Sequence, residues 1–208
     1  MRAGLLFSGG TDSTLAAMLL DRLYDVTLVT THVGKSTDWR YAEETSELLG
    51  FSFEAVEIEE SSVEDAVEQI RGDGNARRAI QILHIASLEA IAERDFDAIA
   101  DGTRRGDRVP TVPRAQAQQL EDRFSVDYVA PLSGFGPRAV DRLVDTYLEV
   151  TSGPSHEINR PDYEAELRKV CAERDGLEQA AALFPSRRQT AVTDLRSRMN
   201  EQVEARDA

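Results

Sequence analysis

The chain has 208 residues, a formal net charge of −14 and a single cysteine. The length suits one α/β domain, and the lone cysteine excludes an internal disulfide and any cysteine-rich metal site. Only two of the 24 basic residues are lysines. A surface so acidic and poor in lysine stays hydrated at high salt, so we expect a halophilic microbial source.

Nothing in the sequence indicates export or a membrane. A strand-like segment begins at residue 3, where a signal peptide would carry its charged and apolar regions. No apolar run approaches the length of a membrane-spanning helix. We therefore expect a cytoplasmic protein without a membrane partner, and a homodimer only as the commonest default.

The hydrophobic pattern predicts strands and helices that alternate along most of the chain. In chain order it predicts a strand at 3–7, a helix at 14–24, a strand at 25–33, a helix at 38–50, a strand at 51–58, helices at 62–71 and 76–94, a strand at 96–102, a helix at 116–124, a strand at 126–132, and helices at 137–150, 161–175 and 189–205.

This alternation predicts an α/β fold: a Rossmann-like, open, mostly parallel sheet of five strands with helices on both faces. Ligands of such sheets bind beyond the carboxyl ends of the strands. The segment 152–161, "SGPSHEINRP", is the expected boundary. We expect a main domain over 1–152 and a helical C-terminal extension over 153–208 that packs on the same domain.

The stretch "SGGTDS" at 8–13 joins the first predicted strand to the first predicted helix. Two glycines permit a tight turn and close approach of a ligand to the backbone, and the helix start offers free N–H groups, so the stretch predicts a phosphate site. Ser8 and Ser13 add hydroxyl donors. Phosphate would repel Asp12, so this carboxylate predicts a bridging Mg²⁺ ion. A plain helix cap would need only one such residue, such as Thr11 or Asp12.

"SGGTDS" after the first strand resembles the signature of the PP-loop, or N-type, ATP pyrophosphatases, an adenine nucleotide alpha hydrolase-like superfamily. The resemblance implies ATP and Mg²⁺ as cofactors and cleavage between the α- and β-phosphates. It also implies adenylation of a substrate oxygen, followed by attack of a nitrogen or sulfur nucleophile. Backbone N–H groups of the loop would hold the phosphates, those of Gly9, Gly10, Thr11, Asp12 and Ser13.

A second stretch, "GTRRGDR" at 102–108, resembles the second loop of several tRNA-modifying members, Gly-(His/Thr)-x-x-Asp-Asp. Gly102, Thr103 and Asp107 match this pattern, and Gly106 stands in place of the first aspartate. The resemblance implies that Gly102 and Thr103 contact the nucleotide and that Asp107 shares Mg²⁺ with Asp12. Asp101 lies beside the loop as a further carboxylate.

The resemblance also suggests catalytic roles for Ser8, Asp12, Lys35 and Arg104, the last two as positive groups near the departing pyrophosphate, with Arg105 and Arg108 as further candidates. Adenine would lie at the end of the second strand, near Thr31 and Val33. The segment "VGKST" at 33–37 imitates a Walker A loop, but valine occupies position 29, where that loop needs glycine, so we reject this interpretation.

The chain is also similar to small archaeal proteins related to tRNA-modifying enzymes, so tRNA is one candidate acceptor. Residues 104–114 and 186–198 each carry four arginines and one aspartate. Such clusters on an acidic chain indicate an anionic partner, either a triphosphate or an RNA backbone. Cys171 falls at the spacing of a helix core, which predicts a buried thiol rather than a sulfur relay.

Two functions remain open on the sequence. The first is an ATP-dependent, AMP-forming enzyme whose acceptor and nucleophile are unknown. The second is a non-catalytic regulator or subunit that binds ATP or AMP without turnover, which the glycine at 106 and the small size of the chain favour.

Overall fold

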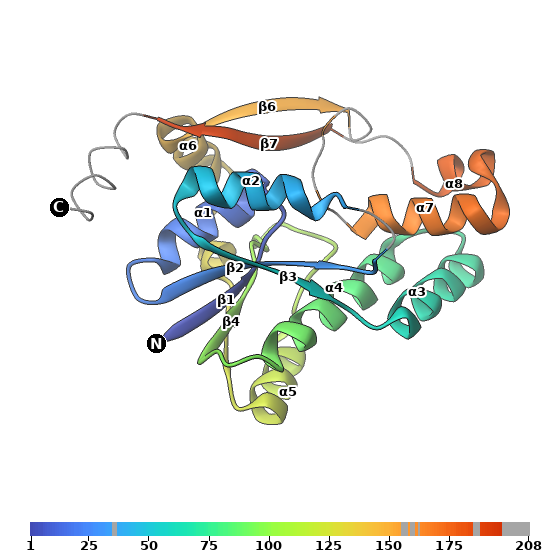
Figure 1. The fold of residues 1–208 in the computed structure, drawn as a ribbon, viewed down its shortest axis with the longest axis horizontal. Helices are drawn as coiled ribbons and strands as arrows, with labels where there is room; N and C mark the ends of the chain where they lie inside the picture. The colour runs from blue at the N-terminus through green and yellow to red at the C-terminus, as the bar shows by residue number, and fades with distance from the viewer. Residues whose placement is uncertain (35–36, 155–157, 159–160, 162, 185–187, 197–208) are drawn as a thin grey trace.

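The computed structural model describes residues 1–34, 37–154, 158, 161, 163–184 and 188–196 (Figure 1). Its elements, in chain order, are β1 (Arg2–Leu6), α1 (Thr11–Leu20), β2 (Asp25–His32), α2 (Trp39–Leu49), β3 (Ser52–Glu57), α3 (Glu60–Asp73), α4 (Arg77–Ala92), β4 (Ala98–Ala100), α5 (Arg114–Phe124), β5 (Asp127–Val129), the 3-10 helix η1 (Pro131–Gly134), α6 (Pro137–Tyr147), β6 (Leu148–Pro154), α7 (Tyr163–Asp175), α8 (Leu177–Leu183) and β7 (Arg188–Leu195).

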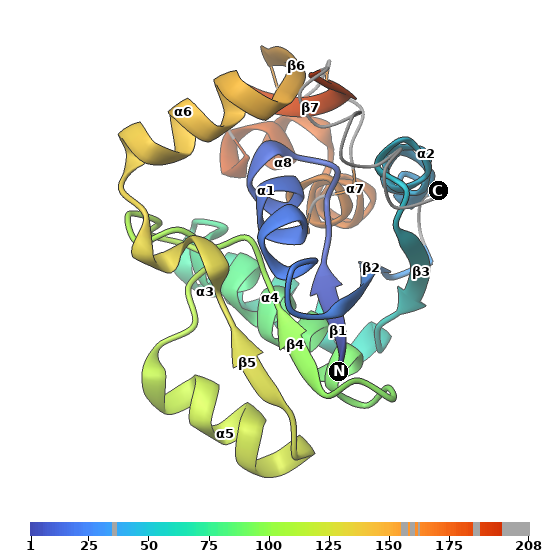
Figure 2. The ribbon, with the colours of Figure 1, turned by 90° about the vertical axis from the view of Figure 1, so that its left-hand side faces the viewer.

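The predicted α/β fold is confirmed. Five parallel strands form one sheet in the order β3-β2-β1-β4-β5. Residues 3–5 of β1 and all three residues of β4 are small or aliphatic and buried, as expected for strands covered on both faces. Helices α1, α2 and α6 pack on one face, and α4 and α5 on the other (Figure 2).

The strand order reverses direction next to β1, because β2 lies on one side of it and β4 on the other. Open parallel sheets bind ligands at this switch point, beyond the carboxyl ends of the strands. Residues 7–10, here called the phosphate loop, follow β1, and residues 101–113, here called the second loop, follow β4. The topology therefore brings the two predicted loops to the same edge of the sheet.

The predicted helix over 189–205 is wrong where the structure describes it. Residues Arg188–Leu195 form β7, which pairs antiparallel with β6, and residues 197–205 lie outside the described part. The segment is rich in β-branched residues at Thr190, Val192 and Thr193, and its pairing with a strand some 40 residues earlier overrides a weak helical pattern. Likewise, the helix predicted at 137–150 ends at Tyr147, where β6 begins.

The C-terminal segment also contains the expected helices. The helix predicted at 161–175 is confirmed as α7, and a shorter helix, α8, follows it. The boundary expected at 152 falls inside β6, so the hairpin β6–β7 joins the two parts of the chain, and their division stays a prediction. Among the described helices, none is long and apolar enough to cross a membrane.

The second loop lies directly against the start of α1. A Cβ atom added at Gly102 would come within 2.8 Å of the backbone nitrogen of Ser13 and 2.9 Å of the carbonyl carbon of Asp12. Such distances are shorter than non-bonded contacts allow, and neither atom belongs to a flexible side chain. Glycine at 102 is therefore the residue that lets the second loop touch the first turn of α1.

We predict that Gly102→Ala lowers the free energy of unfolding by about 1–3 kcal/mol, because the new methyl group overlaps the backbone of α1. Urea unfolding of the purified chain measures this change. The matched control is Gly106→Ala in the same loop, where an added Cβ meets nothing within 4 Å. Its stability should stay within about 0.5 kcal/mol of the parent, and an equal loss in both variants would contradict the contact.

Candidate functional site

The phosphate loop turns sharply between β1 and α1. Gly9 has a φ of +69°, in the left-handed region that glycine adopts without strain. Gly10 is the N-cap residue of α1 and supplies no side-chain cap, so the expected capping alternative with Thr11 or Asp12 is not what the structure shows. The hydroxyl of Ser13 bonds to the carbonyl of Gly10 at 3.2 Å. The first N–H groups of α1 thus have no side-chain cap and can bind an anion.

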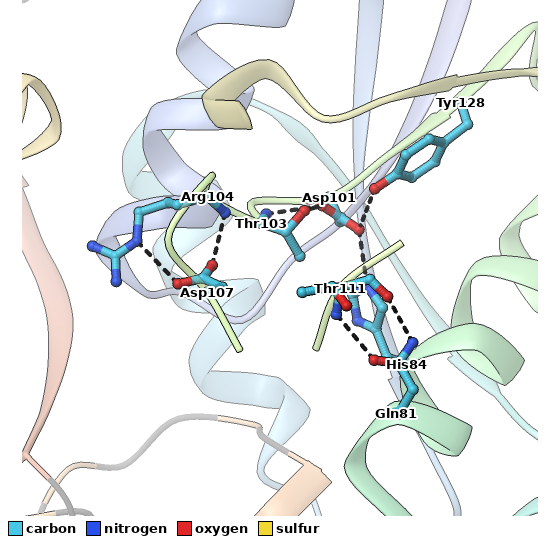
Figure 3. Close-up of polar contacts among 8 residues, drawn as sticks. All are labelled: Gln81, His84, Asp101, Thr103, Arg104, Asp107, Thr111 and Tyr128. Carbon is cyan, nitrogen blue, oxygen red and sulfur yellow. Dashed lines mark hydrogen bonds and ion pairs between the residues drawn. The ribbon is translucent and has the colours of Figure 1, made fainter. Parts of the chain in front are cut away.

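The two predicted metal ligands, Asp12 and Asp107, both contact the guanidinium of Arg104. The Nε atom of Arg104 lies 3.4 Å from a carboxylate oxygen of Asp12 and 3.4 Å from one of Asp107. The backbone N–H of Arg104 also donates to Asp107, at 2.7 Å (Figure 3). One carboxylate from the start of α1 and one from the second loop therefore lie beside the same guanidinium, and this oxygen donor set suits Mg²⁺, which binds through one or two carboxylates and phosphate oxygens.

The carboxylate of Asp101 is bonded to groups of the protein itself. One of its oxygens accepts hydrogen bonds from the backbone N–H and the hydroxyl of Thr103, at 2.8 and 2.6 Å. The other contacts Nε2 of His84 at 2.8 Å and accepts from the hydroxyl of Tyr128 at 2.9 Å (Figure 3). The side chain is almost fully buried. Four contacts within the protein thus occupy this carboxylate and hold the start of the second loop in place.

These contacts shift two pKa values. Burial alone would raise the pKa of Asp101, but the hydrogen bond and electrostatic attraction of His84, with the hydrogen bonds of Thr103, outweigh it and hold that pKa below its usual value. Burial and the nearby charge of Asp101 raise the pKa of Tyr128, so its phenol keeps its proton at neutral pH.

Helix α4 holds the second loop at both ends. His84 fixes its first residue through Asp101, and Gln81, one helical turn earlier, fixes Thr111 near its end. The amide of Gln81 donates to the carbonyl of Thr111 at 2.7 Å and accepts from its N–H at 3.0 Å (Figure 3). Since both anchors lie on one helix, the loop has a fixed position relative to the sheet.

A cavity of about 380 Å³ opens between the two loops, β2, α2 and the C-terminal segment. Its size falls in the range of small-molecule sites. Seven of the predicted site residues line it: Ser8, Asp12, Ser13, Thr31, Gly102, Thr103 and Asp107. Gly9, Gly10, Thr11, Val33 and Arg104 lie on the same segments without lining it, and Lys35 lies outside the described residues. The roles of all these residues stay predictions.

At the end of β2, side chains already contact the groups expected to bind adenine. The N–H of Val33 lies 3.2 Å from a carboxylate oxygen of Glu166, a buried residue of α7 that also lines the cavity. The hydroxyl of Thr31 bonds to that of Ser87 at 2.7 Å. Sequence reasoning missed Glu166, because only its position beside the apolar Leu167 hints at an inward-facing carboxylate.

The C-terminal segment adds further lining residues and confirms the buried cysteine. Arg188 and Gln189 of β7 line the cavity, although the sequence placed Arg188 only within an arginine cluster. Cys171 is buried in α7, as predicted, and burial raises the pKa of its thiol. The arginines of the second loop differ from one another: Arg104 contacts carboxylates, whereas Arg105 and Arg108 are exposed and form no ion pair with any described residue.

Comparison with known proteins gives three findings. The model of a family of unknown function, DUF7411, matches residues 1–194. An uncharacterised protein of Methanocaldococcus jannaschii is 36% identical over 197 residues, which cover 94% of this chain and 97% of that protein. A crystal structure from the same organism, titled as a predicted subunit of tRNA methyltransferase, is similar with a TM-score of 0.85 and 35% identity, over 95% of this chain and 98% of that one.

We predict that Asp101→Asn lowers the free energy of unfolding by about 3 kcal/mol at pH 7, because an amide brings N–H groups against the donors that surround the carboxylate. The pKa of Asp101 is lower in the folded chain than in the unfolded one, so its stabilisation is complete above the unfolded pKa of about 3.9. It is lost as the pH falls through the lower, folded pKa. Urea unfolding between pH 7 and pH 3 should show the difference from the parent shrink only below about pH 4.

The control for this series is Asp122→Asn, which changes an exposed carboxylate of α5. Its stability should follow the parent within about 0.5 kcal/mol at every pH. If Asp101→Asn and the parent have the same free energy of unfolding at pH 7, the carboxylate does not stabilise the loop.

Proposed function

The chain belongs to the family of unknown function DUF7411, and we propose that it binds ATP with Mg²⁺ in this cavity and adenylates an oxygen of an acceptor. The proposal depends on one observation: Asp12 and Asp107 both contact the guanidinium of Arg104, next to the start of α1, which has no side-chain cap. An acidic pair next to an anion-binding helix end suits a phosphate chain that arrives with a divalent ion.

Each segment of the site has a role in this proposal. Backbone N–H groups at the start of α1 bind the phosphates, and Ser8 adds a hydroxyl. Asp12 and Asp107 would hold Mg²⁺, which when bound neutralises phosphate charge and favours attack at phosphorus. Arg104, in contact with both carboxylates, adds positive charge beside the departing pyrophosphate.

The reaction has two balanced steps. An acceptor oxygen attacks the α-phosphorus as the bond to the β-phosphate breaks, which gives an adenylated acceptor and pyrophosphate. A nitrogen or sulfur nucleophile then displaces AMP from that acceptor. Cys171 is buried and lines no part of the cavity, so we infer that the nucleophile comes from outside this chain.

We infer that tRNA supplies the acceptor. The structural neighbour's title names tRNA methyltransferase, and the exposed Arg105 and Arg108 lie on the second loop, whose residues line the cavity. Arginines without a carboxylate partner among the described residues bind phosphate without first breaking an ion pair. On a chain of charge −14 they mark the place where an RNA backbone can approach the site.

A second function has support of its own. The similar crystal structure is described as a predicted subunit, and the second loop has Gly106 where the resembled pattern has an aspartate. Under this alternative the chain binds ATP or AMP without turnover and acts through a partner. The two functions differ only in chemistry, because both need the same nucleotide site.

We predict that the parent releases pyrophosphate from ATP when Mg²⁺ and total tRNA are present at molar salt. Asp12→Ala and Gly10→Val should weaken ATP binding at least about tenfold, since one loses a charged ligand and the other fills the backbone cradle. Calorimetry measures binding, and a coupled assay measures pyrophosphate. Asp122→Ala, an exposed carboxylate of α5, is the control and should keep full affinity.

The outcomes separate the alternatives. Saturable ATP binding without pyrophosphate release from any tRNA fraction would favour the non-catalytic subunit. Full ATP affinity in Asp12→Ala and Gly10→Val would overturn the site itself.

For the acceptor, we predict that the double variant Arg105→Gln and Arg108→Gln binds tRNA about tenfold more weakly, with a salt slope shallower by about two. Fluorescence anisotropy with labelled tRNA measures both. The matched control is Arg94→Gln with Arg123→Gln, which removes the same charge from arginines paired with Glu54 and Glu89. An equal loss of tRNA affinity in both double variants would show that binding depends on net charge alone and would contradict a specific role for Arg105 and Arg108.

A further inference from the structure

The C-terminal strand β7 lies on the phosphate loop. The N–H of Val192 donates to the carbonyl of Gly9 at 3.1 Å, and the hydroxyls of Thr190 and Thr11 are 3.2 Å apart. The ribbon shows the hairpin β6–β7 along one side of the molecule, above α1 and α2 (Figures 1 and 2). Residues from the far end of the chain therefore reach the loop proposed to hold the nucleotide phosphates.

The geometry of this strand sets the direction of Arg188. Successive side chains of a strand point to opposite faces, so Arg188, Thr190 and Val192 share one face. The register between β6 and β7 is regular over these residues. Thr190 on that face touches the start of α1, and Val192 is buried in the core that includes Leu15 of α1. Arg188 follows in line, about 7 Å along the strand from Thr190, and it lines the cavity.

The charges around the cavity make this arginine distinctive. Five carboxylates line the cavity: Asp12, Asp38, Asp101, Asp107 and Glu166. Among the described lining residues, Arg188 is the one lysine or arginine. It is exposed and makes no ion pair with the residues that the structure describes, whereas Arg104 is held by Asp12 and Asp107. The surroundings thus leave the guanidinium of Arg188 available to an anion.

We infer that Arg188 is a phosphate-binding residue that contacts the β- and γ-phosphates of the nucleotide. This inference rests on the proposed function, because it assumes that a nucleotide occupies the cavity. The guanidinium offers paired N–H donors that match phosphate oxygens. In this arrangement the start of α1 and Arg188 of β7 both contact the phosphate chain.

The test is calorimetry of the full chain with Mg²⁺ and each of three probes: ATP, AMP and inorganic pyrophosphate. Arg188→Gln should weaken ATP and pyrophosphate binding about tenfold to a hundredfold, the usual range for losing a hydrogen bond to a charged group. AMP lacks the β- and γ-phosphates, so its affinity should change less than about twofold. Thermal unfolding should match the parent, because the side chain is exposed.

The matched control is Arg142→Gln, which removes the same charge from an exposed residue of α6 away from the cavity. All three probes should bind this variant as they bind the parent. If Arg142→Gln weakens ATP as much as Arg188→Gln does, the effect is one of net charge and the inference is overturned.

The remaining outcomes are also decisive. Equal losses of ATP and AMP in Arg188→Gln would place the arginine near the α-phosphate or the nucleoside and overturn the assignment. Unchanged ATP affinity would overturn it as well, while leaving the proposed function intact. If the parent binds none of the three probes, the proposed function itself fails.

Discussion

The close approach of Gly102 to the start of α1 is the contact on which the site depends. It places the second loop against the backbone of Asp12 and Ser13 with no side chain between them. Asp101, the buried residue before Gly102, is held by His84 and Tyr128, so the loop leaves β4 in one direction. Backbone contact and buried hydrogen bonds together hold the second loop where Asp107 and Asp12 both lie beside Arg104.

Electrostatics impose a second constraint on the same place. The cavity of this acidic chain is lined with carboxylates, which would repel a triphosphate. Asp101 and Glu166 already have donors within the protein, so their charge is partly balanced there. Arg104 lies beside both Asp12 and Asp107, and its single positive charge offsets only one of their two negative charges. Under the proposed function, a phosphate chain would therefore need to arrive with further positive charge, as it does when it carries a divalent ion.

Sequence reasoning reached the sheet, its parallel order and the place of both loops, because these follow from local patterns. Alternating strands and helices predict the topology, and the topology brings the residues after β1 and β4 together. Sequence reasoning could not find the contacts of Asp101 or Glu166, because they join residues that are distant in sequence and follow no spacing pattern. The strand β7 was missed for the same reason, since its partner lies on β6 and pairing of this kind is decided by tertiary context.

These missed contacts share one consequence. Thr11 and Thr190 are 179 residues apart in sequence, yet their hydroxyls touch. Helix α7 likewise reaches the wall of the cavity. Its Glu166 contacts Val33, and the ammonium of its Lys169 lies 2.7 Å from the lining residue Asp38. The first and last parts of the chain therefore build the walls of one cavity. A nucleotide held between them would join both parts, so its binding energy would stabilise the docking of the C-terminal segment as well as the phosphate loop.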